Sequence, residues 1–176
     1  MLDGEPYEVV DAAFSRMQQR KAVLQARIRS LKNGKLLDRT FQASDEFEAA
    51  DIDKKTLMYV YGHRGEYVFN DPKNQKVRYT LNEEQVGDRK KWLKPNTEIT
   101  AVFLGENMLT FTLPIKMDFK ITEAPPGIQG DRSSGGTKAV TIETGAIVQV
   151  PLFINTDDII RINTETGDYV ERVEKA

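Results

Sequence analysis

Alternation between apolar and polar residues marks short strands along most of the chain. From Leu24 to Arg29 apolar and polar residues alternate, which is typical of a strand with one face on a core and the other in solvent. Further strand-like segments span residues 7–10, 36–41, 57–61, 66–69, 77–81, 97–104, 108–113, 116–123 and 140–142. This pattern predicts an all-β protein.

Turn-forming residues separate these strands. Asp3-Gly4 and Asn33-Gly34 are two-residue hairpin signals, and Asn-Gly favours a type I′ turn, in which both central residues have positive φ. A hairpin turn at Asp3-Gly4 needs an incoming strand, and only Met1 and Leu2 precede it. We therefore expect that one strand is missing from the start of this sequence or that its start codon was called late.

One helical segment interrupts the strands. Asn82 predicts the N-cap of a helix from Glu83 to about Leu93, with acidic residues in its first turn and basic residues near its end. Gly87 lies inside this helix and weakens it. Together with the strands around it, the helix indicates a small closed barrel of the OB type. With an acidic connector at 44–53, the chain divides into predicted domains 1–49, 50–113 and 114–176.

The segment Phe14–Arg29 predicts a β-hairpin arm with an exposed tip. The tip, Met17–Lys21, has no apolar alternation, and from Phe14 to Phe41 there are eight basic residues and one acid. The whole chain, in contrast, has a net charge of -2. A local basic excess on an acidic protein favours a polyanionic partner at this end of the molecule, although a solvated, charge-rich strand face has the same pattern.

Composition limits the chemistry that the chain can perform. It has no cysteine and a single histidine, His63, which excludes disulfides, Cys-based zinc sites and histidine-rich metal clusters. The loop Gly127–Lys138 lacks the lysine of a phosphate-cradling P-loop and is followed by a strand rather than a helix. No apolar run is long enough to span a bilayer. We expect no metal, no cofactor and no membrane association.

The sequence from Lys138 onward closely resembles the C-terminal signature of bacterial translation elongation factor P. The matching elements, at fixed spacing, are Lys138-Ala139, Thr144–Ala146, Val148–Phe153, Ile159-Ile160, Thr164, Gly167–Val170 and Arg172. The similarity covers essentially the whole chain, and its other parts are Met1–Tyr7, Val86–Asp88, Lys91–Leu93 and Gly127–Lys138.

The resemblance implies a KOW/SH3-like β domain followed by two OB-fold β-barrels, in an L shape similar to tRNA. It implies a monomeric, cytoplasmic elongation factor, not an enzyme, that binds both ribosomal subunits between the P and E sites. Such a factor contacts the P-site peptidyl-tRNA and the E-site codon of the mRNA and relieves stalling at consecutive prolines, whose ring makes them poor reactants. It stimulates peptide-bond formation by positioning the peptidyl-tRNA, without covalent chemistry of its own.

The resemblance places the contact with the CCA end of peptidyl-tRNA at the arm tip, Gln18, Gln19, Arg20 and Lys21. The family carries there a lysine that is extended after translation, or an arginine that is glycosylated in some lineages, whereas the aligned position here is Gln19. Three alternatives follow: an unmodified tip in which Gln19 hydrogen-bonds directly, a shifted loop in which Arg20 or Lys21 reaches the tRNA, or an unknown modification of one of these residues. We expect one of the first two, with Arg20 as the main phosphate contact.

The same resemblance implies contacts elsewhere in the chain. The residues implied to contact tRNA or rRNA backbone are Arg16, Arg27, Arg29, Tyr169 and Arg172. The residues implied to contact the small subunit or the E-site codon are Arg132, Ser133, Ser134, Gly135, Gly136, Thr137 and Lys138. For Tyr169 the alternative role, an aromatic residue that closes the C-terminal barrel, is equally compatible with the sequence.

Two other functions fit parts of the pattern. A general OB-fold protein that binds single-stranded RNA, or an RNA chaperone, would need basic, aromatic-lined grooves in both barrels, which the acidic connector and the negative net charge oppose. An enzyme with carboxylate chemistry would need paired carboxylates beside a pocket, and the sequence shows no such signal.

Overall fold

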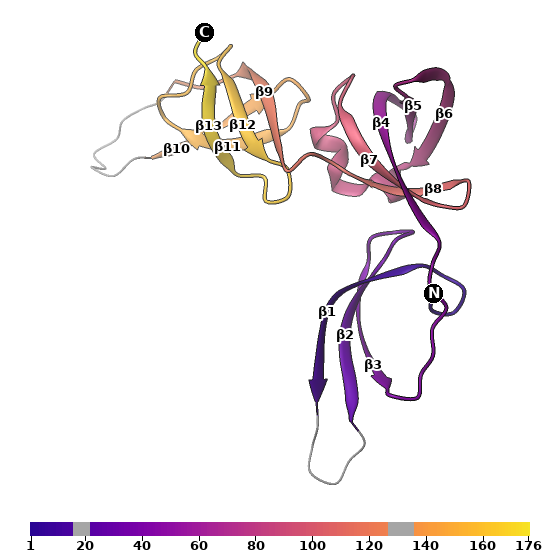
Figure 1. The fold of residues 1–176 in the computed structure, drawn as a ribbon. Helices are drawn as coiled ribbons and strands as arrows, with labels where there is room; N and C mark the ends of the chain where they lie inside the picture. The colour runs from indigo at the N-terminus through magenta and orange to yellow at the C-terminus, as the bar shows by residue number, and fades with distance from the viewer. Residues whose placement is uncertain (16–21, 127–135) are drawn as a thin grey trace.

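The computed structural model describes residues 1–15, 22–126 and 136–176, which form antiparallel sheets in three parts (Figure 1). The N-terminal sheet contains β1 (Tyr7–Ser15), β2 (Val23–Ser30) and β3 (Leu36–Gln42). The central unit contains β4 (Ile52–His63), β5 (Glu66–Asp71), β6 (Asn74–Asn82), α1 (Glu83–Val86), the 3₁₀ helix η1 (Gly87–Trp92), β7 (Glu98–Leu104) and β8 (Asn107–Thr112). The C-terminal unit contains β9 (Lys116–Glu123), β10 (Thr137–Ile142), β11 (Ile147–Pro151), β12 (Ile159–Asn163) and β13 (Tyr169–Glu174). The prediction of an all-β fold with one short helical segment is confirmed.

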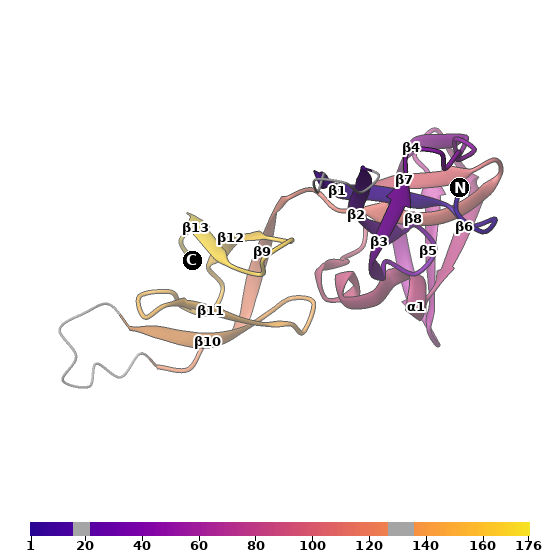
Figure 2. The same cartoon turned by 90° about the horizontal axis from the view of Figure 1, so that it is seen from below.

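The three parts are arranged in an L, with the central unit at the corner (Figure 1). The N-terminal sheet extends down from the corner, and the C-terminal unit extends to the side. In the perpendicular view the N-terminal sheet overlies the central unit, whereas the C-terminal unit stands apart from both (Figure 2). The far end of the β1–β2 hairpin and the start of β10 therefore lie at opposite ends of the molecule.

The N-terminal sheet has a small core and two largely exposed outer strands. In β2 the side chains of Ala26 and Ile28 are buried and those of Arg27 and Arg29 are exposed, so the predicted alternation is confirmed. Strand β1 is exposed along most of its length, and Phe14 retains 80% of its surface. Within the described residues β1 pairs only with β2.

The two hairpin signals in this sheet form different turns. Leu2 and Glu5 exchange backbone hydrogen bonds of 2.8 and 2.9 Å around Asp3 and Gly4, which have φ values of 50° and 77°, so a two-residue type I′ turn forms there. The type I′ turn predicted at Asn33-Gly34 is wrong, because of these two residues only Gly34 has a positive φ.

The side chain of Ser30 explains this difference. Its hydroxyl accepts hydrogen bonds from the amides of Lys32 and Asn33, while the amide of Gly34 donates to the carbonyl of Ser30 at 2.9 Å. The chain therefore makes a wider turn between β2 and β3, since local side-chain bonds satisfy the backbone in place of a tight hairpin.

The central unit is a five-stranded sheet of order β6-β5-β4-β7-β8. Its core is rich in aromatic residues, with Phe69, Phe103 and Phe111 fully buried. Strand β4 begins at Ile52, so the predicted acidic connector is shorter than expected and its last residues belong to the sheet.

The predicted helix after Asn82 is correct in its start and wrong in its continuity. Asn82 caps α1 through a bond from the Gln85 amide, and the Gln85 side chain accepts from the Asn82 amide, which is a complete capping box. Gly87 then adopts φ 56° and ψ −145°, which no α-helix contains, and the chain continues as η1. The consequence is a one-turn helix whose Val86 is fully buried in the central core.

The C-terminal unit repeats the connectivity of the central unit. Its sheet has the order β11-β10-β9-β12-β13, so in both units the first strand lies between the second and the fourth. Between β11 and β12 a turn with buried Ile154 stands where the central unit has α1 and η1. The buried face of β9 is formed by Met117, Phe119 and Ile121, whereas Ile115, just before the strand, is 55% exposed.

Within the residues that the structure describes, neither five-stranded sheet closes into a barrel through hydrogen bonds, so the closed barrels expected from the sequence are corrected to open sheets. The edge strands β6 and β8 of the central unit lie near one another, as do β11 and β13 of the C-terminal unit, but no ladder joins them. In the described part of the chain no helix is long and apolar enough to cross a membrane.

Candidate nucleic-acid interface

The stem of the predicted arm is an ordered β-hairpin. Strands β1 and β2 pair from Tyr7 opposite Ser30 to Ser15 opposite Val23, with one irregularity near Val9. The residues expected to contact nucleic acid at the tip, Arg16, Gln18, Gln19, Arg20 and Lys21, lie outside the described residues. The hairpin therefore delivers both ends of the tip segment to the far end of the L.

Arg27 and Arg29 lie on the exposed face of β2, where acids of the neighbouring strands partly neutralise them. Arg27 Nε donates to Asp38 Oδ1 of β3 at 2.9 Å, and this hydrogen bond raises the pKa of Arg27 and lowers that of Asp38. Arg29 Nη1 lies 3.7 Å from Glu8 Oε2 of β1, a longer and looser pair. Both arginines stay more than 45% exposed and accessible to a phosphate.

A cavity of about 760 Å³ separates the N-terminal sheet from the central unit. Arg29 lines it from β2 and Arg89 lines it from η1. The Arg89 guanidinium donates to the carbonyls of Gln85, Val86 and Phe111 and lies 4.3 Å from the centre of the Phe111 ring.

Arg89 lacks an acidic partner within the described residues, because every acceptor it uses is neutral. Burial lowers the pKa of Arg89, and the charge of Arg29 lowers it further. The sequence indicated Arg89 only as a basic residue near a helix end. That Arg89 and Arg29 line the same cavity becomes visible only in the structure.

The predicted C-terminal loop is shorter than the sequence indicated. Arg132, Ser133, Ser134 and Gly135 lie outside the described residues, whereas Thr137 and Lys138 belong to β10. Gly136 packs against Leu152, since a Cβ on Gly136 would come within 3.2 Å of that side chain.

Lys138 is buried rather than presented to solvent. It retains 9% of its surface, and its ammonium group donates to the carbonyl oxygen of Pro125 at 2.9 Å. This bond ties the two ends of the loop together. Lys138 therefore holds the base of the loop, which corrects its expected position as an exposed loop residue.

Tyr169 and Arg172 are both partly engaged inside the C-terminal unit. Tyr169 packs against the C-terminal core, and burial raises the pKa of its hydroxyl. Arg172 Nη1 lies 3.4 Å from Oδ2 of Asp158, whose side chain is 2% exposed, and its guanidinium lies 5.2 Å from the Phe153 ring centre. These contacts favour the structural alternative for Tyr169 and leave one face of Arg172 available to solvent.

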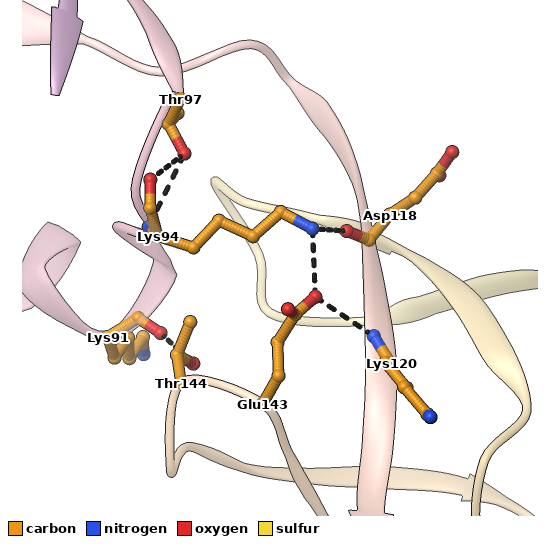
Figure 3. A network of polar contacts seen from close by, with 7 residues as sticks. All are labelled: Lys91, Lys94, Thr97, Asp118, Lys120, Glu143 and Thr144. Carbon is orange, nitrogen blue, oxygen red and sulfur yellow. Dashed lines mark hydrogen bonds and ion pairs between the residues drawn. The ribbon is translucent and has the colours of Figure 1, made fainter. Parts of the chain in front are cut away.

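The central and C-terminal units meet at a polar junction, drawn in Figure 3. Lys94 Nζ crosses it and donates to the carbonyl oxygen of Asp118 and to Glu143 Oε1, each at 2.8 Å. The hydroxyl of Thr144 donates back across the junction to the carbonyl of Lys91 at 2.6 Å. Side chains thus join the two units at two points, one at Lys94 and one at Lys91.

Trp92, the last residue of η1, adds an apolar contact to this junction. It is 3% exposed and belongs to the core cluster of the C-terminal unit, where its ring lies 5.8 Å from that of Phe119. A residue of the central unit therefore completes the core of its neighbour. We call the seven residues of Figure 3, together with Trp92, the elbow.

Glu143 is the acidic centre of the elbow. Burial alone would raise the pKa of Glu143, but hydrogen bonds from the Lys94 ammonium and the Lys120 amide outweigh it, so that the pKa is lowered. Glu143 is therefore ionised at neutral pH and keeps the ammonium of Lys94 in place.

The described residues hold no cluster of histidine and acidic side chains that could bind a metal ion. The candidate nucleic-acid residues fall instead into two distant groups: Arg27 and Arg29 on the N-terminal sheet, and the loop base with Tyr169 and Arg172 on the C-terminal unit. The elbow lies on the path between these groups, and no sequence pattern indicated its contacts.

Family models match the chain in three successive segments. They are the elongation factor P KOW-like domain at residues 1–47, the elongation factor P OB domain at 52–111, and the elongation factor P C-terminal domain at 117–172.

Proteins named elongation factor P match nearly the whole chain. The protein of Desulfatibacillum aliphaticivorans is 37% identical over 99% of this chain and 93% of its own length. The protein of Thermodesulfovibrio yellowstonii is 33% identical over 98% of this chain and 91% of its own length. The protein of Corynebacterium urealyticum is 36% identical over 98% of this chain and 92% of its own length. Among solved structures, eukaryotic translation initiation factor 5A from Methanococcus jannaschii aligns with 65% of this chain and 83% of its own, with a TM-score of 0.45 and 17% identity.

Proposed function

Because this chain belongs to the elongation factor P family, whose members are translation elongation factors and not enzymes, we propose that it binds the ribosome between the P and E sites and stimulates peptide-bond formation there. In this proposal it relieves stalling at consecutive prolines by positioning the peptidyl-tRNA. The observation that carries the proposal is the match of all three family models, in order, along the chain.

The physical basis of such a function is positioning. Proline reacts poorly because its ring fixes φ, and holding the peptidyl-tRNA in a reactive geometry lowers the entropic part of the barrier. The L shape supports this role, since it sets an exposed basic hairpin at one end and a tied loop at the other. We propose the domain boundaries 1–49, 50–113 and 114–176, a monomeric state and a cytoplasmic location as parts of the same function.

The contacts in this proposal follow the two ends of the L. The arm tip, with Arg20 as its main phosphate contact, meets the CCA end of peptidyl-tRNA. Arg27 and Arg29 contact nucleic-acid backbone beside it, because both remain exposed despite their acidic partners. The loop above Lys138 meets the small subunit or the E-site codon, with Arg172 facing tRNA or rRNA.

Substitution Arg20→Ala tests this function. We expect it to abolish the rescue of ribosomes stalled at a Pro-Pro sequence in a reconstituted translation system, because it removes the proposed phosphate contact. Arg39→Ala on β3 is the matched control, since it removes one basic residue from the same sheet at a position assigned no contact. Unchanged rescue by Arg20→Ala, with the fold retained by circular dichroism, would contradict the proposal.

A mass measurement separates the alternatives for the tip. An intact mass and a peptide map of residues 16–27, from protein purified from its own cells, report any added group. An unmodified mass means that Gln19, Arg20 and Lys21 act as encoded. An added mass on Arg20 or Lys21 would place the modification at a shifted position.

A further inference from the structure

We infer that the elbow fixes the angle between the central and C-terminal units, and that Lys94 and Trp92 are positioning residues for the proposed activity. The positioning role of Lys94 and Trp92 rests on the proposed function. The fixed angle between the two units does not rest on it and depends only on the contacts across the junction.

The two junctions of the L differ in kind. Across the elbow, Lys94 joins the carbonyl of Asp118 and the carboxylate of Glu143, and Thr144 joins the carbonyl of Lys91 (Figure 3). Between the N-terminal sheet and the central unit, the described residues make no hydrogen bond or ion pair, and a cavity of about 760 Å³ lies there. The contacts that resist a change of angle are therefore concentrated on one side of the corner.

The geometry of the elbow opposes rotation as well as separation. Trp92 enters the C-terminal core beside Phe119, while a Cβ on Gly167, in the turn between β12 and β13, would lie 3.6 Å from the Trp92 ring. The ring is held between β9 and this turn. A rotation of the C-terminal unit would have to withdraw the ring from the core and expose apolar surface to water, which is unfavourable.

The hydrogen bonds of Lys94 are directional, so they restrict the orientation of the two units more than the apolar contact of Trp92 does. The Lys94 side chain lies over the Phe119 ring, with Nζ 5.2 Å from its centre, and its ammonium is shared between an acceptor on β9 and one in the turn between β10 and β11. Glu143 is held in turn by the amide of Lys120 at 3.1 Å. An ammonium with two acceptors that are themselves fixed has one preferred position, which sets the angle between the units.

This fixed angle matters because the proposed function joins two distant sites. If the loop of the C-terminal unit is engaged at one end of the L, the elbow determines where the remainder of the molecule can place the arm. A small displacement of a positioning group can lower a rate by one or two orders of magnitude. The elbow would thus contribute to activity without touching the tRNA.

The experiment uses the full chain, which lacks cysteine, so that two introduced cysteines carry the only spin labels. Glu106→Cys in the β7–β8 turn and Thr156→Cys in the loop before β12 place exposed labels on either side of the elbow. The distribution of distances between the two labels is measured in three labelled proteins: one with no further substitution, one with Lys94→Met and one with Lys90→Met. Lys94→Met keeps the aliphatic stem over Phe119 and removes the charge. Lys90→Met removes an ion pair with Glu83 that lies wholly within the central unit.

We expect a single narrow distance for the unsubstituted elbow and for Lys90→Met, and a broadened distribution for Lys94→Met. In the Pro-Pro rescue assay Lys94→Met should lower the rate by about 10-fold and Lys90→Met should not. Trp92→Phe should keep the narrow distance and Trp92→Ala should lose it. Glu143→Gln removes the charge that holds the Lys94 ammonium, so it should broaden the distribution at neutral pH as Lys94→Met does.

The outcomes distinguish a failure of the inference from a failure of the proposed function. A narrow distance that survives in Lys94→Met overturns the fixed elbow. A broadened distance with normal rescue overturns the positioning role and leaves the proposed function intact. If the unsubstituted protein gives no rescue, the proposed function fails, and the distances alone then decide whether the elbow is fixed.

Discussion

The central and C-terminal units share one strand connectivity but complete their cores in different ways. In the central unit the short helix α1 lies between β6 and β7 and buries Val86 against the sheet. In the C-terminal unit a turn stands at that place, and Trp92 arrives from the neighbouring unit. The same sheet can therefore be completed from within or by a neighbour, and the second solution couples two units mechanically.

Substitution Trp92→Ala should have the largest effect on this comparison. Removing a fully buried tryptophan costs about 3–5 kcal/mol, and the cavity would lie in the C-terminal core although the residue belongs to the central unit. Native-state hydrogen exchange measures it: amides of β9 and β12 should lose protection, while those of β4 and β7 should keep it. Equal loss in both units would show that Trp92 supports both cores and would contradict its assignment to the C-terminal core alone.

Substitution Val86→Ala should have a smaller effect, confined to the other unit. Val86 is fully buried in the central core, and burial of such a side chain contributes about 1.5–3 kcal/mol. The same exchange experiment should now show weaker protection in β4, β5 and β7 with an unchanged C-terminal unit. Loss of protection in β9 would contradict this confinement and would indicate that Leu113, which packs against both cores, couples them as well.

The smallest expected effect is a difference between the two units in their stability at low pH. Asp118 and Glu143 in the C-terminal unit, and Asp158 beside Arg172, have lowered pKa values because of hydrogen bonds that outweigh their burial. A carboxyl group with a lowered pKa stabilises the fold at pH values above its unfolded pKa of about 4, and this contribution is lost as the pH falls through the folded value.

In the central unit, the acid with a lowered pKa is Glu83, which is exposed and paired with Lys90. Between about pH 4 and pH 2 the C-terminal unit should therefore lose exchange protection before the central unit does. Asp158→Asn should reduce this difference, and Glu84→Gln, an exposed acid with no assigned partner, serves as the control. A simultaneous loss in both units would contradict the assignment.

Local patterns in the sequence predicted the elements well. The alternation through Ala26 and Ile28 located β2 and its buried face, and Asn82 located the start of α1. Gly87 was identified as a weak point, and the helix does break there. These features depend on neighbours within a few residues, which a sequence displays directly.

The errors arose where a distant or side-chain contact decides the structure. The turn at Asn33-Gly34 depends on the hydroxyl of Ser30, which offers the backbone an alternative to a tight hairpin. Lys138 carries a charge, which indicates exposure, yet the carbonyl of Pro125 accepts its ammonium inside the fold. Trp92 appeared in the sequence only within the matching segment Lys91–Leu93, and nothing in the neighbouring residues indicated that it belongs to the C-terminal core.

The position of Trp92 also gives the protein an optical property. It is the only tryptophan in the sequence, and its indole is enclosed between Phe119 and the turn at Gly167 with the Lys91 ammonium 4.9 Å from its ring centre. The intrinsic fluorescence of the whole chain at tryptophan wavelengths therefore originates at one joint. A shift in its emission would report, without any dye, a change in the surroundings of the elbow.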